Sequence, residues 1–116
     1  MKKTFALLSA LSVALLSLPT QAAVVTKSFT VSDKALQLTT DQYYPRVYIK
    51  GVDLDGAALG CENNIPVISL GDDNPQGQMM YDTLLAAKES GRTISIVANK
   101  CWAGYSTPQV YSITIH

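Results

Sequence analysis

The sequence predicts a mostly-β domain with one α-helix, and three observations support this fold class. Five short segments are rich in β-branched and aromatic residues, as strands are. A segment between the third and the fourth of them has the periodicity of a helix. The chain contains two cysteines, Cys61 and Cys101, which suit a small exported domain held together by one disulfide.

The first 22 residues are predicted to be a signal peptide. Lys2 and Lys3 make a positive start, residues 5–18 form an uncharged and largely apolar run, and residues 20–22 (TQA) provide a cleavage site. The apolar run is short for a bilayer span, so no membrane anchor is expected. The mature chain, residues 23–116, is then one domain with a secreted or periplasmic location.

The charge of the mature chain argues against nucleic-acid binding. The full sequence has nine basic and nine acidic residues. Removal of Lys2 and Lys3 leaves seven basic residues, so the net charge becomes about −2. A nucleic-acid site needs a basic surface with interleaved aromatic residues, and no such partner is expected here.

Three strands are expected before the helix. They are residues 24–31 (VVTKSFTV), residues 44–50 (YPRVYIK) and residues 65–70 (IPVISL). The mostly polar stretch 32–43 either extends the first strand or forms a loop, and its sequence does not decide between them.

The helix is expected in residues 76–90 (QGQMMYDTLLAAKES). Asn74 is a suitable cap, Pro75 suits the first helical position, and Gly91 suits the left-handed end.

The apolar residues of this helix fall on two sides. Met80, Leu84 and Ala87 share one face at helical spacing, and Met79 and Thr83 join it. Tyr81 and Leu85 form a second apolar pair on another flank, next to Lys88. This pair is either a local contact along the helix or a contact with another subunit, so a homo-oligomer is one expectation.

Two further strands, residues 93–98 (TISIVA) and 109–115 (QVYSITI), follow Gly91. Three strands, a helix and two strands are the connectivity of the OB-fold, a five-stranded and partly open Greek-key barrel with its helix between strands 3 and 4. The Cys61–Cys101 disulfide would join the start of the third strand to the end of the fourth.

The sequence does not predict an enzyme. Its one histidine, His116, is the last residue, no nucleophile elbow is present, and both cysteines are expected to be paired. Residues 53–56 (DLDG) have some likeness to a calcium loop, but the glycine comes too early, so ordinary turn residues are favoured. No metal or cofactor is therefore expected.

Aromatic residues near turns are the candidate ligand site. Trp102 offers a stacking face in a loop after Cys101, and the polar contacts would come from Tyr105, Lys100, Tyr44 and Arg46. The alternative is structural, with Trp102 packed on the disulfide and the tyrosines on the barrel rim.

The stretch 80–102 (MYDTLLAAKESGRTISIVANKCW) resembles the B subunits of bacterial A-B toxins, especially the subtilase-cytotoxin and pertussis-like group. The resemblance rests on the helix with Leu84 and Ala87, its Ser90-Gly91 end, the following strand and the cysteine after it. It implies an OB barrel, a ring of subunits, and an outer surface that binds sialylated or other host glycans. It transfers no individual binding residue.

These observations together predict an exported, non-enzymatic protein that binds a glycan or another cell-surface ligand. The rival interpretation is a periplasmic structural or protein-interaction module, which would use the helix flank and an exposed strand edge and would have no sugar site.

Overall fold

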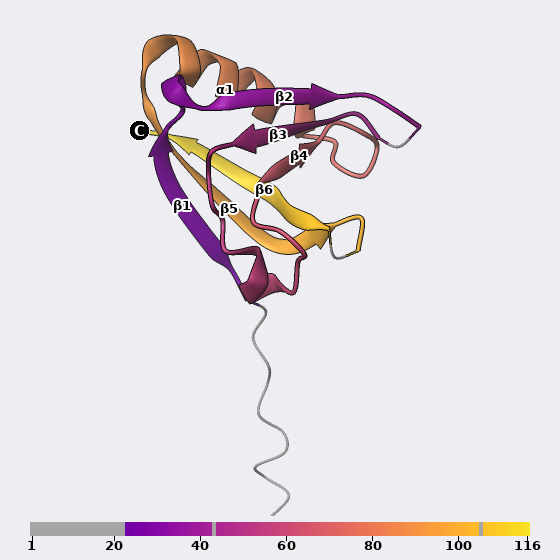
Figure 1. The fold of residues 1–116 in the computed structure, drawn as a ribbon. Helices are drawn as coiled ribbons and strands as arrows, with labels where there is room; N and C mark the ends of the chain where they lie inside the picture. Colours follow the sequence, from indigo (N-terminus) through magenta and orange to yellow (C-terminus); the bar gives the residue numbers. More distant parts are fainter. Residues whose placement is uncertain (1–22, 43, 105) are drawn as a thin grey trace, which may run out of the picture.

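The computed structural model describes residues 23–42, 44–104 and 106–116, which form a six-stranded sheet with one α-helix (Figure 1). The predicted signal peptide lies outside the described residues. No helix in the described ranges is long and apolar enough to cross a membrane. The elements are β1 (Val25–Thr30), the 3-10 turn η2 (Val31–Asp33), β2 (Ala35–Thr39), β3 (Arg46–Lys50), the 3-10 turn η3 (Gly56–Leu59), β4 (Val67–Ser69), α1 (Gly77–Ser90), β5 (Thr93–Trp102) and β6 (Thr107–Ile115).

The strands follow the order β1-β5-β6-β4-β3-β2 across the sheet. Neighbouring strands are antiparallel except β4 and β6, which run parallel and pair at Val67 and Gln109. The sheet is not closed by hydrogen bonds, because β1 and β2 lie at its two edges. These edge strands are nevertheless consecutive in the chain, and η2 joins them at one corner of the fold (Figure 1).

The predicted number of five strands is wrong, since the sheet has six strands and is not closed into a barrel, and the difference arises between residues 24 and 43. The side chain of Val31 is fully buried in the core. Since η2 turns the chain there, the first strand ends at Thr30, and the stretch left open by its sequence forms the separate strand β2. The helix therefore follows the fourth strand, although it lies between the same two segments as predicted.

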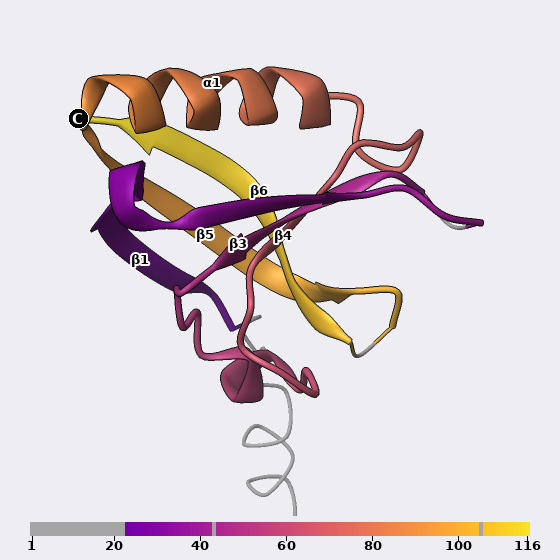
Figure 2. The ribbon, with the colours of Figure 1, turned by 45° about the horizontal axis from the view of Figure 1, so that its top comes forward.

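Helix α1 lies along one side of the sheet and packs against η2, β4 and β6 (Figure 2). Met80, Leu84 and Ala87 are buried, as their spacing predicts. Met79 does not join them, because 71% of its side chain is exposed.

The two ends of α1 differ in how well they were predicted. Gly91 ends the helix with φ of 69°, and its N–H donates to the carbonyl of Ala87, as expected of a helix-ending glycine. At the start no side chain caps the helix. Asn74, the predicted cap, instead donates from its amide to the carbonyl of Ser69 and so ties the preceding loop to β4.

The core lies between the sheet and α1. Its members are apolar side chains from most of the elements: Val31, Ile49, Val52, Leu54, Ile68, Met80, Leu84, Ala87, Ile94, Ile96, Ala98 and Val110.

The predicted disulfide is present, with 5.6 Å between the Cα atoms of Cys61 and Cys101. Cys61 follows η3 in the loop that leads to β4. Cys101 lies within β5, since that strand continues to Trp102, four residues beyond its predicted end. The bond therefore fixes the far end of β5 to a loop without regular structure of its own.

Candidate functional site

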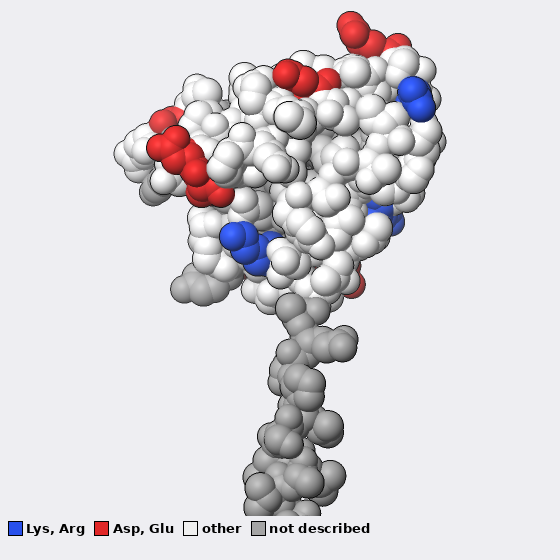
Figure 3. Space-filling model, turned by 180° about the vertical axis from the view of Figure 1, so that it is seen from behind, with Lys and Arg blue, Asp and Glu red and all other residues white. Residues whose placement is uncertain are grey.

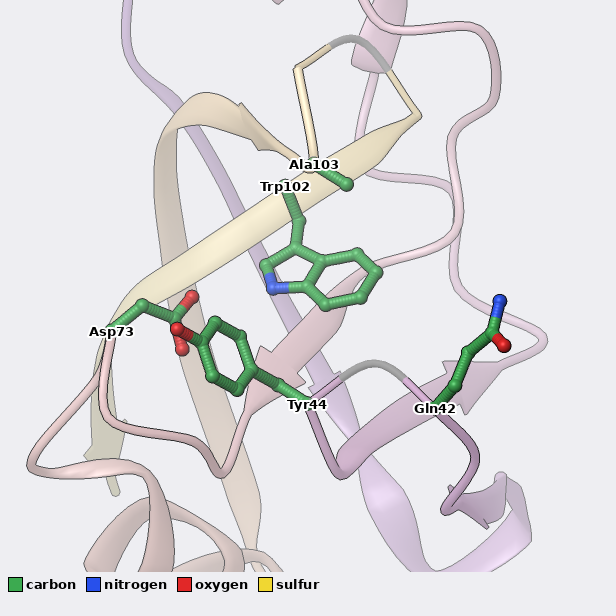
Figure 4. Close-up of a pocket in the computed structure, with 5 residues that line it drawn as sticks. All are labelled: Gln42, Tyr44, Asp73, Trp102 and Ala103. Atoms are coloured by element: carbon green, nitrogen blue, oxygen red, sulfur yellow. The ribbon is translucent and has the colours of Figure 1, made fainter.

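A pocket of about 430 Å³ lies where three connections meet (Figure 4). The connection from β2 to β3 provides Gln42 and Tyr44, and the connection from β4 to α1 provides Asp73. The end of β5 and the turn after it provide Trp102 and Ala103. Two of the five predicted ligand residues, Trp102 and Tyr44, thus meet in one cavity.

The turn beside the pocket is held by the disulfide loop. Asn63, two residues after Cys61, donates to the carbonyl of Ser106 from both its backbone N–H and its side-chain amide, the latter at 2.9 Å. Ala103 and Gly104 have φ of 53° and 90°, in the left-handed region that few residues other than glycine adopt. The position of the Ala103 side chain at the pocket is therefore set by a constrained backbone.

Trp102 forms a wall of the pocket and is only 8% exposed. The guanidinium carbon of Arg46 lies 5.0 Å from its ring centroid, so part of the ring surface is already covered. The indole nitrogen lies on the side of the ring that faces Tyr44 and Asp73 (Figure 4). This N–H has no hydrogen-bond partner among the described residues and is not sealed from solvent. It is a donor that a ligand can use.

Arg46 contacts the Trp102 ring but does not line the pocket. Its Nη1 and Nη2 donate to the two carboxylate oxygens of Asp41 at 3.0 and 2.8 Å, and its Nε donates to the Tyr48 hydroxyl at 2.9 Å. The hydrogen bonds that Arg46 donates to Asp41 raise the pKa of Arg46 above its ordinary value. Arg46 was predicted as a ligand contact. Its guanidinium nitrogens are instead hydrogen-bonded to Asp41 and Tyr48, and the Asp41 carboxylate balances its charge.

Tyr44 is the most accessible aromatic residue of the pocket, with 46% of its side chain exposed. Its ring packs directly on Gly71. A Cβ atom at position 71 would lie 2.4 Å from Cδ1 of the tyrosine, which is closer than atoms can approach. The hydroxyl end of the ring points toward Asp73 (Figure 4).

Asp73 and Gln42 are polar residues of the pocket that the sequence did not single out. The buried hydroxyl of Ser69 donates to one oxygen of Asp73 and so fixes the carboxylate. Gln42 lies on the other side of Trp102 from Asp73 (Figure 4). Both residues come from irregular connections, where no periodicity marks a functional position.

The remaining predicted site residues lie elsewhere. Lys100 is exposed on β5 and does not line the pocket, and Tyr105 lies outside the described residues. On α1, Tyr81 is half-buried and Leu85 is 40% exposed. Lys88, on the same flank, donates to the carbonyls of Ser32 and Lys34. Part of this flank therefore makes contacts inside the protein itself.

A second hollow, of about 170 Å³, lies between α1 and β6. Met79 and Tyr111 expose 71% and 46% of their side chains beside it. β6 pairs with β4 only at Gln109, so the rest of that edge, residues 110–115, has no strand partner among the described residues. This region combines exposed apolar side chains with an open strand edge.

Acidic atoms gather at the end of the molecule that carries the pocket (Figure 3). That end contains Asp41 on the connection from β2 to β3, and Asp72 and Asp73 on the connection from β4 to α1. A basic group lies lower on the same face, but no lysine lines the pocket. Within the described ranges, no group of three or more His, Cys, Asp or Glu side chains could hold a metal ion.

Comparison of the chain with protein-family models, with curated proteins and with solved structures finds no match. The resemblance to toxin B subunits therefore remains a prediction from the sequence, and the geometry of the pocket is the main guide to function.

Proposed function

We propose that this chain is an exported, non-enzymatic binding protein that recognises a glycan or a similar hydroxyl-rich surface ligand through Trp102 and Tyr44. The observation that carries the proposal is the convergence of two aromatic side chains with Asp73 and Gln42 from three separate connections. Aromatic rings pack against the apolar faces of a sugar, and the polar groups around them bind its hydroxyls. The volume of about 430 Å³ falls within the usual range for small-ligand sites, about 300–1,000 Å³.

The topology supports the proposed relationship to the OB-fold. If β1 and β2 are two halves of one first strand bent at η2, the strand order becomes that of a five-stranded barrel with one open seam. The disulfide suits an oxidising compartment, which supports the proposed export. Both points agree with the resemblance to toxin B subunits.

A pair of tyrosine variants tests the glycan site. Tyr44 and Tyr111 are equally exposed, at 46%, but Tyr44 lines the pocket and Tyr111 lies beside α1. Ligand binding can be followed by fluorescence, since Trp102 is the one tryptophan of the chain. Tyr44→Ala should weaken glycan binding by about 1–3 kcal/mol, by analogy with stacking aromatic residues in other sites, while Tyr111→Ala leaves it unchanged. A wild-type protein that binds no member of a neutral and sialylated glycan panel would overturn the proposal.

A second candidate function is self-association through the open strand edges. β2 and β6 contain no charged residue, although charges are the usual protection of an exposed edge. Leu38 on β2 is 52% exposed, and Tyr111 on β6 is 46% exposed. The proposed occupant of the β6 edge is therefore β2 of a second copy, a head-to-tail contact that can build a ring.

Sedimentation velocity at high micromolar concentration tests this second function. The expected result is an oligomer that Tyr111→Lys dissociates, because the substitution places a charge at the open edge. Leu85→Asp tests the helix flank separately. A monomeric wild type removes the argument for self-association, whereas dissociation by Leu85→Asp alone would place the contact on the helix and not on the strand edge.

A further inference from the structure

We infer that the pocket selects a neutral sugar ring over one that carries a carboxylate, such as sialic acid or a uronic acid. This inference rests on the proposed function and specifies the ligand class of the same site. It differs from the sialylated ligands that the toxin resemblance includes.

The first reason is the charge of the lining. Asp73 is the charged residue among Gln42, Tyr44, Asp73, Trp102 and Ala103, and its charge is negative. The buried Ser69 hydroxyl holds this carboxylate by donating to it, so the carboxylate is a fixed part of the wall. A ligand carboxylate in the pocket would face it without a compensating cation from the lining.

The second reason is the state of the nearest cation. Arg46 is 8% exposed, and both of its terminal nitrogens are hydrogen-bonded to Asp41. Its Nη1 also donates to the carbonyl of Tyr44 at 3.1 Å. Recognition of a carboxylate by arginine needs a free planar fork, and this fork is already occupied.

A cationic ligand fits less well than a neutral one. A positive group stacked on Trp102 would compete with Arg46, whose guanidinium already lies 5.0 Å from the ring centroid. The pocket also contains the indole N–H, a donor that an ammonium group cannot use. Hydroxyls both donate and accept, so a neutral sugar can use Asp73 and this donor together.

Matched sugar pairs test the inference on the mature, disulfide-bonded protein. Galactose and galacturonate, and glucose and glucuronate, differ only in the group at C6, and lactose and 3′-sialyllactose extend the comparison to sialic acid. With Trp102 fluorescence and calorimetry as readouts, each neutral sugar should bind about tenfold more tightly than its charged partner, the ratio expected for like charges a few ångströms apart in partly exposed surroundings.

Two substitutions each remove one negative charge. Together they distinguish an effect of the charge inside the pocket from an effect of the overall electrostatic field of the protein. Asp73→Asn retains an oxygen that can accept from Ser69 and should reduce the preference for the neutral partner to about twofold or less. Asp72→Asn, at an exposed neighbour that does not line the pocket, should leave the preference intact. Thermal melts of both variants establish that they are folded.

The outcomes are distinguishable. Equal or tighter binding of the carboxylate sugars would overturn this inference while the proposed glycan site stands. Tighter binding of galactosamine than of galactose, lost in Asp73→Asn, would identify a cationic ligand and also overturn it. Failure of every sugar to bind would overturn the proposed function and this inference with it.

Discussion

The Nη1 and Nη2 atoms of Arg46 lie 3.0 and 2.8 Å from the two carboxylate oxygens of Asp41, and this ion pair holds the guanidinium 5.0 Å from the ring centroid of Trp102. The pair therefore joins the connection before β3 to the end of β5. Its contribution should be structural, since it maintains the shape of the pocket without touching the ligand.

Arg46→Lys should lower the free energy of unfolding by about 1–3 kcal/mol, because a lysine cannot form the two parallel hydrogen bonds to Asp41. Urea unfolding measures the change. The control is the ion pair of the exposed Asp33 with the half-buried Lys34, with 3.8 Å between carboxylate oxygen and Nζ, where Asp33→Asn should change stability by less than about 0.5 kcal/mol. Equal effects of the two substitutions would contradict a special role for Arg46.

The disulfide should supply a large part of the stability. It closes a loop with a sequence separation of 40 residues. In the chain-entropy description such a loop contributes about 4 kcal/mol, so the double variant Cys61→Ser, Cys101→Ser should be destabilised by about that amount. A melting temperature that does not respond to reduction would rule this out.

Processing is expected to remove residues 1–22, so that the mature chain begins at Ala23. Intact-mass measurement of exported protein should show the loss of these residues and of two thiol hydrogens. Retention of Met1, or two free thiols after non-reducing denaturation, would contradict the expected route of export.

Two glycine substitutions should have different consequences. In Gly77→Ala the new Cβ would lie 2.1 Å from the backbone oxygen of Ser69, so the start of α1 must shift and stability should fall by about 1–3 kcal/mol. In Gly71→Ala the new Cβ would lie 2.7 Å from Cβ of Tyr44 as well as against its ring, so ring rotation cannot remove the clash and the connection that carries Tyr44 must shift. Gly71→Ala should therefore weaken ligand binding as well as folding, whereas Gly77→Ala, at a position that does not line the pocket, should affect folding alone. Unchanged ligand binding in Gly71→Ala would contradict the role of Tyr44 in the pocket.

Trp102→Ala should lower the free energy of unfolding by about 3–5 kcal/mol, the usual cost of removing a buried aromatic side chain. The reason is its 8% exposure and its contact with Arg46. Chemical denaturation with circular dichroism measures this change in the absence of the tryptophan signal. A loss below about 1 kcal/mol would mean that the ring serves the ligand more than the fold.

Particular residues show where prediction from the sequence succeeded. The spacing of Met80, Leu84 and Ala87 identified the buried face of α1, and Gly91 identified its end, because helix periodicity and the left-handed conformation are local properties. The pairing of Cys61 with Cys101 also followed, since two cysteines allow one intramolecular bond. The break at Val31 was missed, because a strand that turns to bury one side chain keeps the local composition of a continuous strand.

Local sequence thus determined the main elements, the buried face of the helix and the covalent link, all of which depend on residues near each other in the chain or on a unique pairing. Only the tertiary structure decided the open six-stranded order, the burial of Trp102 and the hydrogen bonding of the Arg46 guanidinium to Asp41. It also decided that Asp73 and Gln42 meet the aromatic residues. The physical reason is that the pocket forms where three connections converge, and the packing that brings distant connections together leaves no periodic pattern in any one of them.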